Sequence, residues 1–213
     1  YEAEHLGSVF WFDLVMNNQH GTAERPFEWW CHTFQHSIEQ IGTVVLVLAP
    51  WSSPVPLTRA WCLFEIMCSL NANQVDFRIR MPTKQEREVV NALRRDHRSA
   101  INALVGVKTE ESNAFLATDK DNIFKAVEAS IGFQKLNSMV NDQMRHWFVQ
   151  QGTRAVQQLE ASGTDLSEDT EFAASCGQLG NMLYGFGQHE LALELFAKAL
   201  RITQKVLGED HPS

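Results

Sequence analysis

The sequence predicts an α/β domain followed by an all-helical region, and two observations support this fold class. Up to Pro82, short apolar and β-branched runs alternate with segments whose apolar residues have helical spacing. After Pro82, the apolar patterns have the helical period. We therefore expect an α/β domain at residues 1–82, a helical region at 83–160 and a terminal helical hairpin at 172–213.

Three strands are predicted in the α/β domain. Residues 9–15 form an aromatic and β-branched run that Asn17 and Asn18 close with a turn. Residues 43–49 are continuously apolar, which is typical of a strand covered on both faces, and residues 75–80 form a weaker run. Because helices separate the strands, this order favours a parallel sheet with right-handed crossovers.

Two helices connect these strands. Residues 27–41 carry apolar side chains at helical spacing, with Pro26 suited to the helix start and Gly42 to its end. Residues 58–71 form the second helix, and at ~100° per residue one side of it collects the apolar side chains that should face the sheet. That side is predicted to hold Ala60, Leu63, Phe64, Met67, Leu70 and Asn71, with Ile66 at its margin.

Three further helices are predicted after Pro82. Residues 83–104 form an amphipathic helix, residues 119–130 a shorter one, and a third has a pronounced apolar stripe. The first stripe comprises Val90, Leu93, His97, Ile101 and Leu104, and the last comprises Leu136, Val140, Met144, Trp147 and Phe148. The polar, acidic residues 163–170 read as a loop before the terminal hairpin.

The terminal hairpin resembles a tetratricopeptide repeat (TPR). The defining small and large positions are occupied by Leu179, Gly180, Leu183, Gly187, Ala192, Phe196 and Ala199. Small residues let two antiparallel helices approach closely, and Gly187 ends the first helix. The segment 207–212 is similar to the linker of the kinesin-light-chain type of repeat. The resemblance implies protein or peptide partners; the alternative is an ordinary helical hairpin.

A single repeat cannot bury its own hydrophobic face, and repeat arrays need about three copies. We therefore expect the chain to be the start of a longer array.

Helix 58–71 also carries the main candidate for a chemical site. Trp61 and Glu65 are four residues apart on the side away from the predicted core, and Ser69 follows one turn later. An aromatic ring beside a carboxylate suits a flat, cationic ligand or a developing oxocarbenium charge. The alternative is structural, with Trp61 packed under residues 54–56 and Glu65 paired with Arg59.

Here residues 8–82 resemble part of a TIR domain. The similarity lies in a helix with the pattern Ile38-x-x-Ile41, the strand 44–48 and the run Arg59-Ala-Trp-Cys-Leu-Phe-Glu-Ile66. The run at 10–13 is similar to the second TIR strand, and residues 15–26 stand where the mobile BB loop would be. The resemblance implies a flavodoxin-like parallel sheet and self-association of TIR domains.

The same resemblance implies a catalytic site for cleavage of NAD⁺ to nicotinamide and ADP-ribose. Glu65 matches the family's catalytic glutamate, Trp61 would lie beside the nicotinamide, and Asp13 and Ser69 would be further NAD⁺ contacts. NAD⁺ would be a substrate, and no cofactor is required. The family's first strand and helix have no counterpart here, residues 51–58 replace a shorter Ser-rich turn, and many TIR domains bind partners without catalysis.

The amino-acid composition limits which functions and cellular locations we expect for the protein. A net charge of -8 and a pI near 5.5 argue against nucleic-acid binding. The apolar run at 44–50 is far shorter than the roughly 20 residues that cross a bilayer. Four cysteines without a CxxC pair favour a reducing compartment, so we expect a cytoplasmic protein.

The sequence also contains two weaker motifs. His32 and His36 have a zinc-compatible spacing, but no matching third ligand follows, and no metal site is predicted. A basic group at residues 94–98 could receive a phosphate or form a solvated helix face.

The leading hypothesis is a signalling or scaffold protein that binds partner proteins through TIR-like and TPR modules. The second is a TIR-type NAD⁺ glycohydrolase, and the third is a purely structural TPR scaffold.

Overall fold

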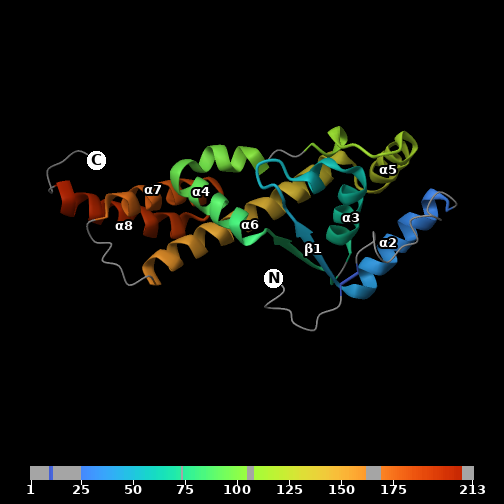
Figure 1. Cartoon of the computed structure of the whole chain (residues 1–213). Helices are drawn as coiled ribbons and strands as arrows, with labels where there is room; N and C mark the ends of the chain where they lie inside the picture. Colours follow the sequence, from blue (N-terminus) through green and yellow to red (C-terminus); the bar gives the residue numbers. More distant parts are fainter. Residues whose placement is uncertain (1–9, 12–24, 73, 105–107, 162–168, 208–213) are drawn as a thin grey trace.

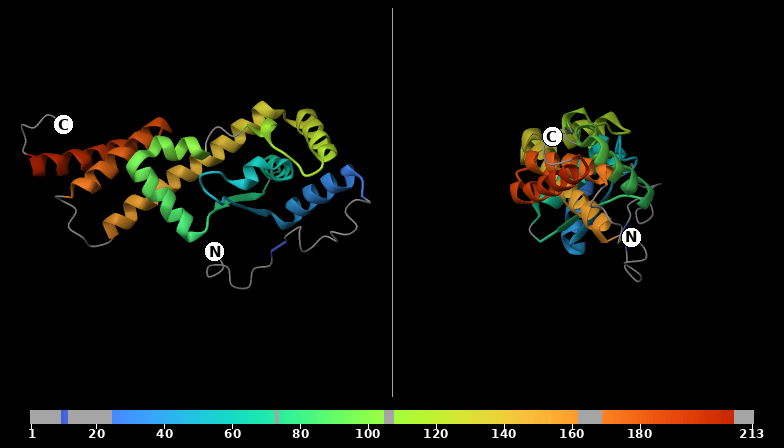
Figure 2. Two further views of the ribbon diagram at one scale, coloured as in Figure 1. Left: turned by 45° about the horizontal axis from the view of Figure 1, so that its top comes forward. Right: turned by 90° about the vertical axis from the view of Figure 1, so that its left-hand side faces the viewer.

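The computed structural model describes residues 10–11, 25–72, 74–104, 108–161 and 169–207. The described part is elongated, with the α/β unit at one end and a two-helix hairpin at the other (Figure 1). The long helix α6 (Phe133–Ala161) runs between these two ends in both orientations (Figure 2). Among the described residues, no helix combines the length and apolar character that crossing a membrane requires.

The described sheet has two parallel strands, β1 (Thr43–Val47) and β2 (Asp76–Arg80). Their register runs from Thr43 opposite Asp76 to Val47 opposite Arg80. The predicted parallel pairing is confirmed. The strand expected at 9–15 falls almost wholly outside the described residues, so the flavodoxin-like extent of the sheet stays a prediction.

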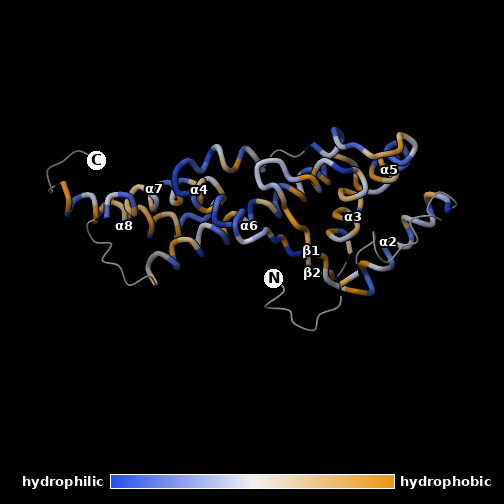
Figure 3. The backbone as a smooth tube through the Cα atoms, in the orientation of Figure 1, coloured by the Kyte–Doolittle hydropathy of each residue, from blue (hydrophilic) through white to orange (hydrophobic). Residues whose placement is uncertain are grey.

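The expectation that β1 is covered on both faces is wrong at its end. Leu46 is buried, whereas Val47 is 50% exposed. Figure 3 shows that β1 and α3 are rich in apolar residues, whereas α4 is mostly hydrophilic. The core of this unit therefore lies on the α3 side of the strands, and continuous apolar sequence did not require cover on the other side.

Two helices flank the sheet. Helix α2 (Phe27–Ile41) has the predicted bounds: Pro26 precedes it, and Gly42 (φ 69°) ends it with its N–H bonded to the carbonyl of Ile38. A left-handed φ at this position suits glycine. Helix α3 (Ala60–Asn71) follows the short 3-10 turn η3 (Val55–Thr58) and forms the crossover between the two strands.

Helix α4 (Thr83–Leu104) differs from the prediction in two ways. Its backbone leaves helical geometry at Asp96, whose carboxylate accepts hydrogen bonds from the N–H and hydroxyl of Ser99 and so caps the second segment. The buried positions are Val89, Leu93 and Ala100. The structure therefore buries Val89 and Ala100, which the predicted stripe omitted, while Val90 and Ile101 of the stripe are partly buried and pack against the core, and His97 is half-buried; the side chain of Leu104 lies outside the described residues.

The next helices agree with the sequence. They are α5 (Ala117–Ser130) and α6, and the short 3-10 turn η4 (Thr109–Glu111), which the sequence did not predict, precedes them. All five residues of the apolar stripe predicted for α6 are buried: Leu136, Val140, Met144, Trp147 and Phe148. The loop predicted at 163–170 lies outside the described residues except at its last two positions, where α7 already begins.

The hairpin consists of α7 (Thr170–Gly185) and α8 (His189–Leu207). Asp169 caps α7 by accepting a hydrogen bond from the N–H of Phe172, and Gly187 (φ 77°) makes the turn. The helices meet closely at Gly180, where an added Cβ would lie 2.7 Å from the Phe196 ring. The hairpin, its turn glycine and its small crossing residue are confirmed.

The helical middle covers a side of α7 that α8 leaves open. From α4, Arg94 Nε donates to Ser175 Oγ (3.2 Å), and His97 Nδ1 is hydrogen-bonded to Gln178 Oε1 (2.8 Å). From α6, Gly152 is so close that an added Cβ would lie 2.6 Å from the Met182 methyl carbon. The hairpin is thus joined to the rest of the described chain by α4 and α6.

The same substitution at two glycines of α7 should have opposite effects. An added Cβ at Gly177 meets no neighbouring side chain within 4 Å in the described part of the chain, so Gly177→Ala should raise the free energy of unfolding by up to about 1 kcal/mol through helix propensity. At Gly180 the methyl group overlaps Phe196, and overpacking costs about 1–3 kcal/mol. Urea unfolding should therefore rank Gly180→Ala below Gly177→Ala by about that amount. Equal stabilities would contradict the close helix crossing.

Candidate protein-interaction site

Trp61 lies inside an aromatic cluster. Its ring centroid is 5.6 Å from those of Phe27 and Phe34 on α2 and 6.1 Å from that of Phe64 on α3. Its Nε1 donates a hydrogen bond to the carboxylate of Asp119 on α5 (3.2 Å). These contacts hold the indole between three helices and occupy its polar atom. They come from α2, α3 and α5.

Two of the other candidate NAD⁺ residues, Glu65 and Ser69, lie in the described part of the chain. Ser69 is 2% exposed, and its hydroxyl donates to the backbone carbonyl of Glu65 (2.7 Å). Its predicted position off the core is wrong, and Asn71, assigned to the core, is exposed. Glu65 is half-buried one turn from Trp61, and Asp13 lies outside the described residues. A catalytic role for Glu65 therefore stays a prediction.

Helices α2 and α3 also carry two thiols that are poor nucleophiles. Burial, and to a smaller extent the nearby negative charge of Glu28, raises the pKa of Cys31 to about 11. Burial, and to a smaller extent the electrostatic effect of Cys31, raises the pKa of Cys68 to about 12. Because the thiolate is the reactive form, both groups stay protonated and unreactive near neutral pH. The rings of His32 and His36 stack at 6.0 Å, and the described residues contain no group of three or more potential metal ligands.

The basic group on α4 is divided between two environments. Arg95 and Arg98 are exposed, while Arg94 and His97 make the hydrogen bonds to α7 described above. The expectation of a solvated face thus holds for half of the group only. The spacing of charges could not show this, because the partners Ser175 and Gln178 are 81 residues away.

A different surface is open on α7. Ala174, Asn181 and Tyr184 are exposed on one side of this helix, and Gly177 lies among them. Apart from its own stretch of helix, no described residue has a heavy atom within 4 Å of an added Cβ at Gly177. We call these four residues the α7 strip. Because its side chains are small or uncharged up to Tyr184, a partner's backbone could approach the helix closely along it.

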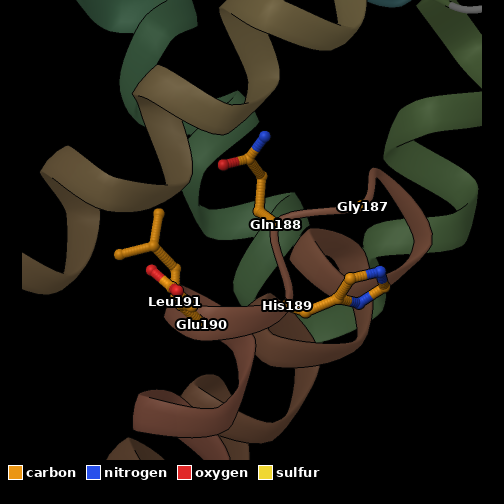
Figure 4. A pocket seen from close by; sticks show the side chains of 5 residues that line it. All are labelled: Gly187, Gln188, His189, Glu190 and Leu191. Carbon is orange, nitrogen blue, oxygen red and sulfur yellow. The ribbon is translucent and has the colours of Figure 1, made fainter.

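The α7 strip ends beside a shallow pocket at the hairpin turn. The pocket has a volume of about 350 Å³ and is lined by residues 187–191. Gln188 and Leu191 point away from His189 (Figure 4). The ring of His189 instead meets Tyr184 edge-on, with centroids 4.9 Å apart. The strip, the aromatic pair and the pocket together offer hydrogen-bonding groups and one apolar surface, which suits a peptide.

A closely crossed helical hairpin with an open strip on its first helix is the architecture of a protein-interaction repeat. Residues 172–213 match the tetratricopeptide repeat family, and the repeat is of the kinesin-light-chain type. No curated protein and no solved structure matches the chain. The comparisons give no support for a TIR domain in the α/β unit.

The anchoring of Trp61 can be measured with a double-mutant cycle. Trp61→Phe keeps a ring but removes the donor, and Asp119→Ala removes the acceptor, so each should lower the free energy of unfolding by about 1 kcal/mol or more. The double variant should lose about 1 kcal/mol less than the sum. Trp29→Phe at a 38% exposed tryptophan is the control. Additive losses would show that the hydrogen bond contributes nothing.

Proposed function

We propose that this protein is a protein-interaction or scaffold protein whose hairpin α7–α8 binds a partner polypeptide. The observation that carries the proposal is the TPR match at residues 172–213, because repeats of this family generally mediate protein-protein interaction. The open α7 strip supports it by supplying a surface on the same hairpin. A cytoplasmic location, expected from the cysteine content, forms part of the proposal.

The cover provided by α4 and α6 supports the α7 strip as the binding surface. Helix α8 packs on one side of α7 at Gly180, and α4 and α6 pack on a second at Ser175 and Met182. At ~100° per residue, the strip occupies the remaining side. The partner best suited to it is an extended, uncharged peptide that hydrogen-bonds to Asn181 and places an apolar side chain on Tyr184.

NAD⁺ cleavage through a TIR-like unit is the competing proposal. It rests on the resemblance around Trp61 and Glu65 and on the parallel order of β1 and β2. Against it stand the aromatic cluster around Trp61 and the engaged hydroxyl of Ser69. Partner binding is therefore the better-supported function, and the α/β unit serves in it as the body that carries the hairpin.

The binding surface is tested by Gly177→Arg, which places a long side chain across the α7 strip. Arginine is a good helix former, so the variant should fold, and it should bind the partner at least about tenfold more weakly. Partners are identified by affinity capture with quantitative mass spectrometry and then confirmed with purified proteins by calorimetry. The control is Phe115→Arg, since Phe115 is fully exposed on the loop before α5.

Proteins that bind the wild type and Phe115→Arg but lose affinity for Gly177→Arg support the proposal. Equal affinity for all three chains would place partner binding elsewhere.

The competing proposal is tested by nicotinamide release from NAD⁺, measured by chromatography for the wild type and for Glu65→Ala. We expect no release above that of buffer in either sample, because Trp61 is already held by three neighbouring rings. Turnover that is present in the wild type and lost in Glu65→Ala, with unchanged circular dichroism, would establish the enzyme instead.

A further inference from the structure

Helix α8 has a second apolar face that the described residues leave uncovered. Its packed side buries Ala192, Leu195 and Ile202 against the rest of the hairpin. Away from that side, Leu193, Leu200 and Leu207 are 67%, 44% and 50% exposed. They recur every seven residues, so they form one line along the helix. Leucines at heptad spacing supply one of the two apolar positions in the seam through which helices pair.

Charged residues flank this leucine line and are sorted along it. The start of α8 carries Glu190 and Glu194, and its second half carries Lys198, Arg201 and Lys205. At ~100° per residue all five fall on the same flank of the line. One end of the helix is therefore acidic and the other basic.

This sorting distinguishes between the two ways in which a second α8 could pair with the first. In a parallel pair, the two-fold axis runs along the seam and places the charged flanks of the two copies on opposite sides of it, so these five residues do not meet their counterparts. In an antiparallel pair, the acidic start of each helix lies beside the basic end of the other. Opposite charges attract and like charges repel across such a seam, so the helix is complementary to itself only when antiparallel.

We propose that two copies of this chain associate through antiparallel pairing of their α8 helices along Leu193, Leu200 and Leu207. A two-fold axis near Leu200 places Leu193 of one copy opposite Leu207 of the other. Such an interface uses the same surface on both copies and closes without leaving a seam for further copies. It covers the exposed leucines, whose burial supplies the driving force.

The pairing lies on a different helix from the proposed partner surface. The α7 strip stays open in the pair, so each copy could hold its own partner, and two linked copies would bind a divalent partner with higher avidity. Self-association and partner binding can therefore fail independently of one another.

The test is the oligomeric state of the full 213-residue chain by sedimentation equilibrium. The wild type should be a concentration-dependent dimer, and Leu200→Glu should raise its dissociation constant at least about tenfold, since two carboxylates would meet at the axis. The control is Phe115→Glu, a fully exposed position outside α8, which should leave the dissociation constant unchanged. A wild type that stays monomeric, as when another segment or another protein covers this face, overturns the proposal.

Charge exchange tests the orientation. Glu194→Lys should weaken the dimer, and adding Lys205→Glu should restore it, because a two-fold axis near Leu200 places position 194 of one copy beside position 205 of the other. In a parallel pair the charged flanks lie on opposite sides of the seam, so the first change would leave the dissociation constant unaltered. An unaltered constant for Glu194→Lys, or no recovery in the double variant, would exclude the antiparallel arrangement.

Discussion

The described architecture depends on one constraint, which is that a two-helix hairpin cannot bury both sides of its first helix. Helix α8 covers the side of α7 that contains Gly180 and leaves Leu179 and Met182 in need of another neighbour. Gly152 supplies that neighbour by letting α6 approach the Met182 side chain. The helical middle therefore acts as a cap for the repeat, the role that atypical terminal repeats play in longer arrays.

Helix α6 satisfies the same constraint at its other end. Its stripe from Leu136 to Phe148 is fully buried, and Asn137 accepts hydrogen bonds from the N–H and hydroxyl of Thr109 in η4. Phe148 in turn lies 6.4 Å from Phe186 of the hairpin. A single helix thus packs against both the hairpin and the segment that leads to α5. Its buried apolar residues connect the two ends of the elongated structure in Figure 2.

The sequence predicted the positions of the helices and strands well, but it predicted less well which of their faces are buried. The reason is physical. Helical spacing and terminal glycines are local, so α2 and the hairpin turn were found with their bounds. A helical wheel assumes a straight helix with one neighbour. At Asp96 the backbone leaves helical geometry, which shifted the buried side of α4. Ser69 shows the same limit, since its hydroxyl bonds to the backbone one turn earlier and can be buried without any polar partner from another element.

The candidate site around Trp61 shows why a local sequence pattern does not by itself identify a ligand site. On the wheel its ring lies away from the α3 core, and nothing within α3 distinguishes a ring that awaits a ligand from one that a distant segment covers. The cover comes from Phe27, 34 residues earlier, and from Asp119, 58 residues later. Once these groups are in place, the ring and its N–H are already used, and a ligand would have to displace both. At Gly177 no neighbouring group among the described residues lies within 4 Å of an added Cβ, so a partner there would not have to displace a described side chain, and the same physical criterion that disfavours a site at Trp61 favours one on the α7 strip.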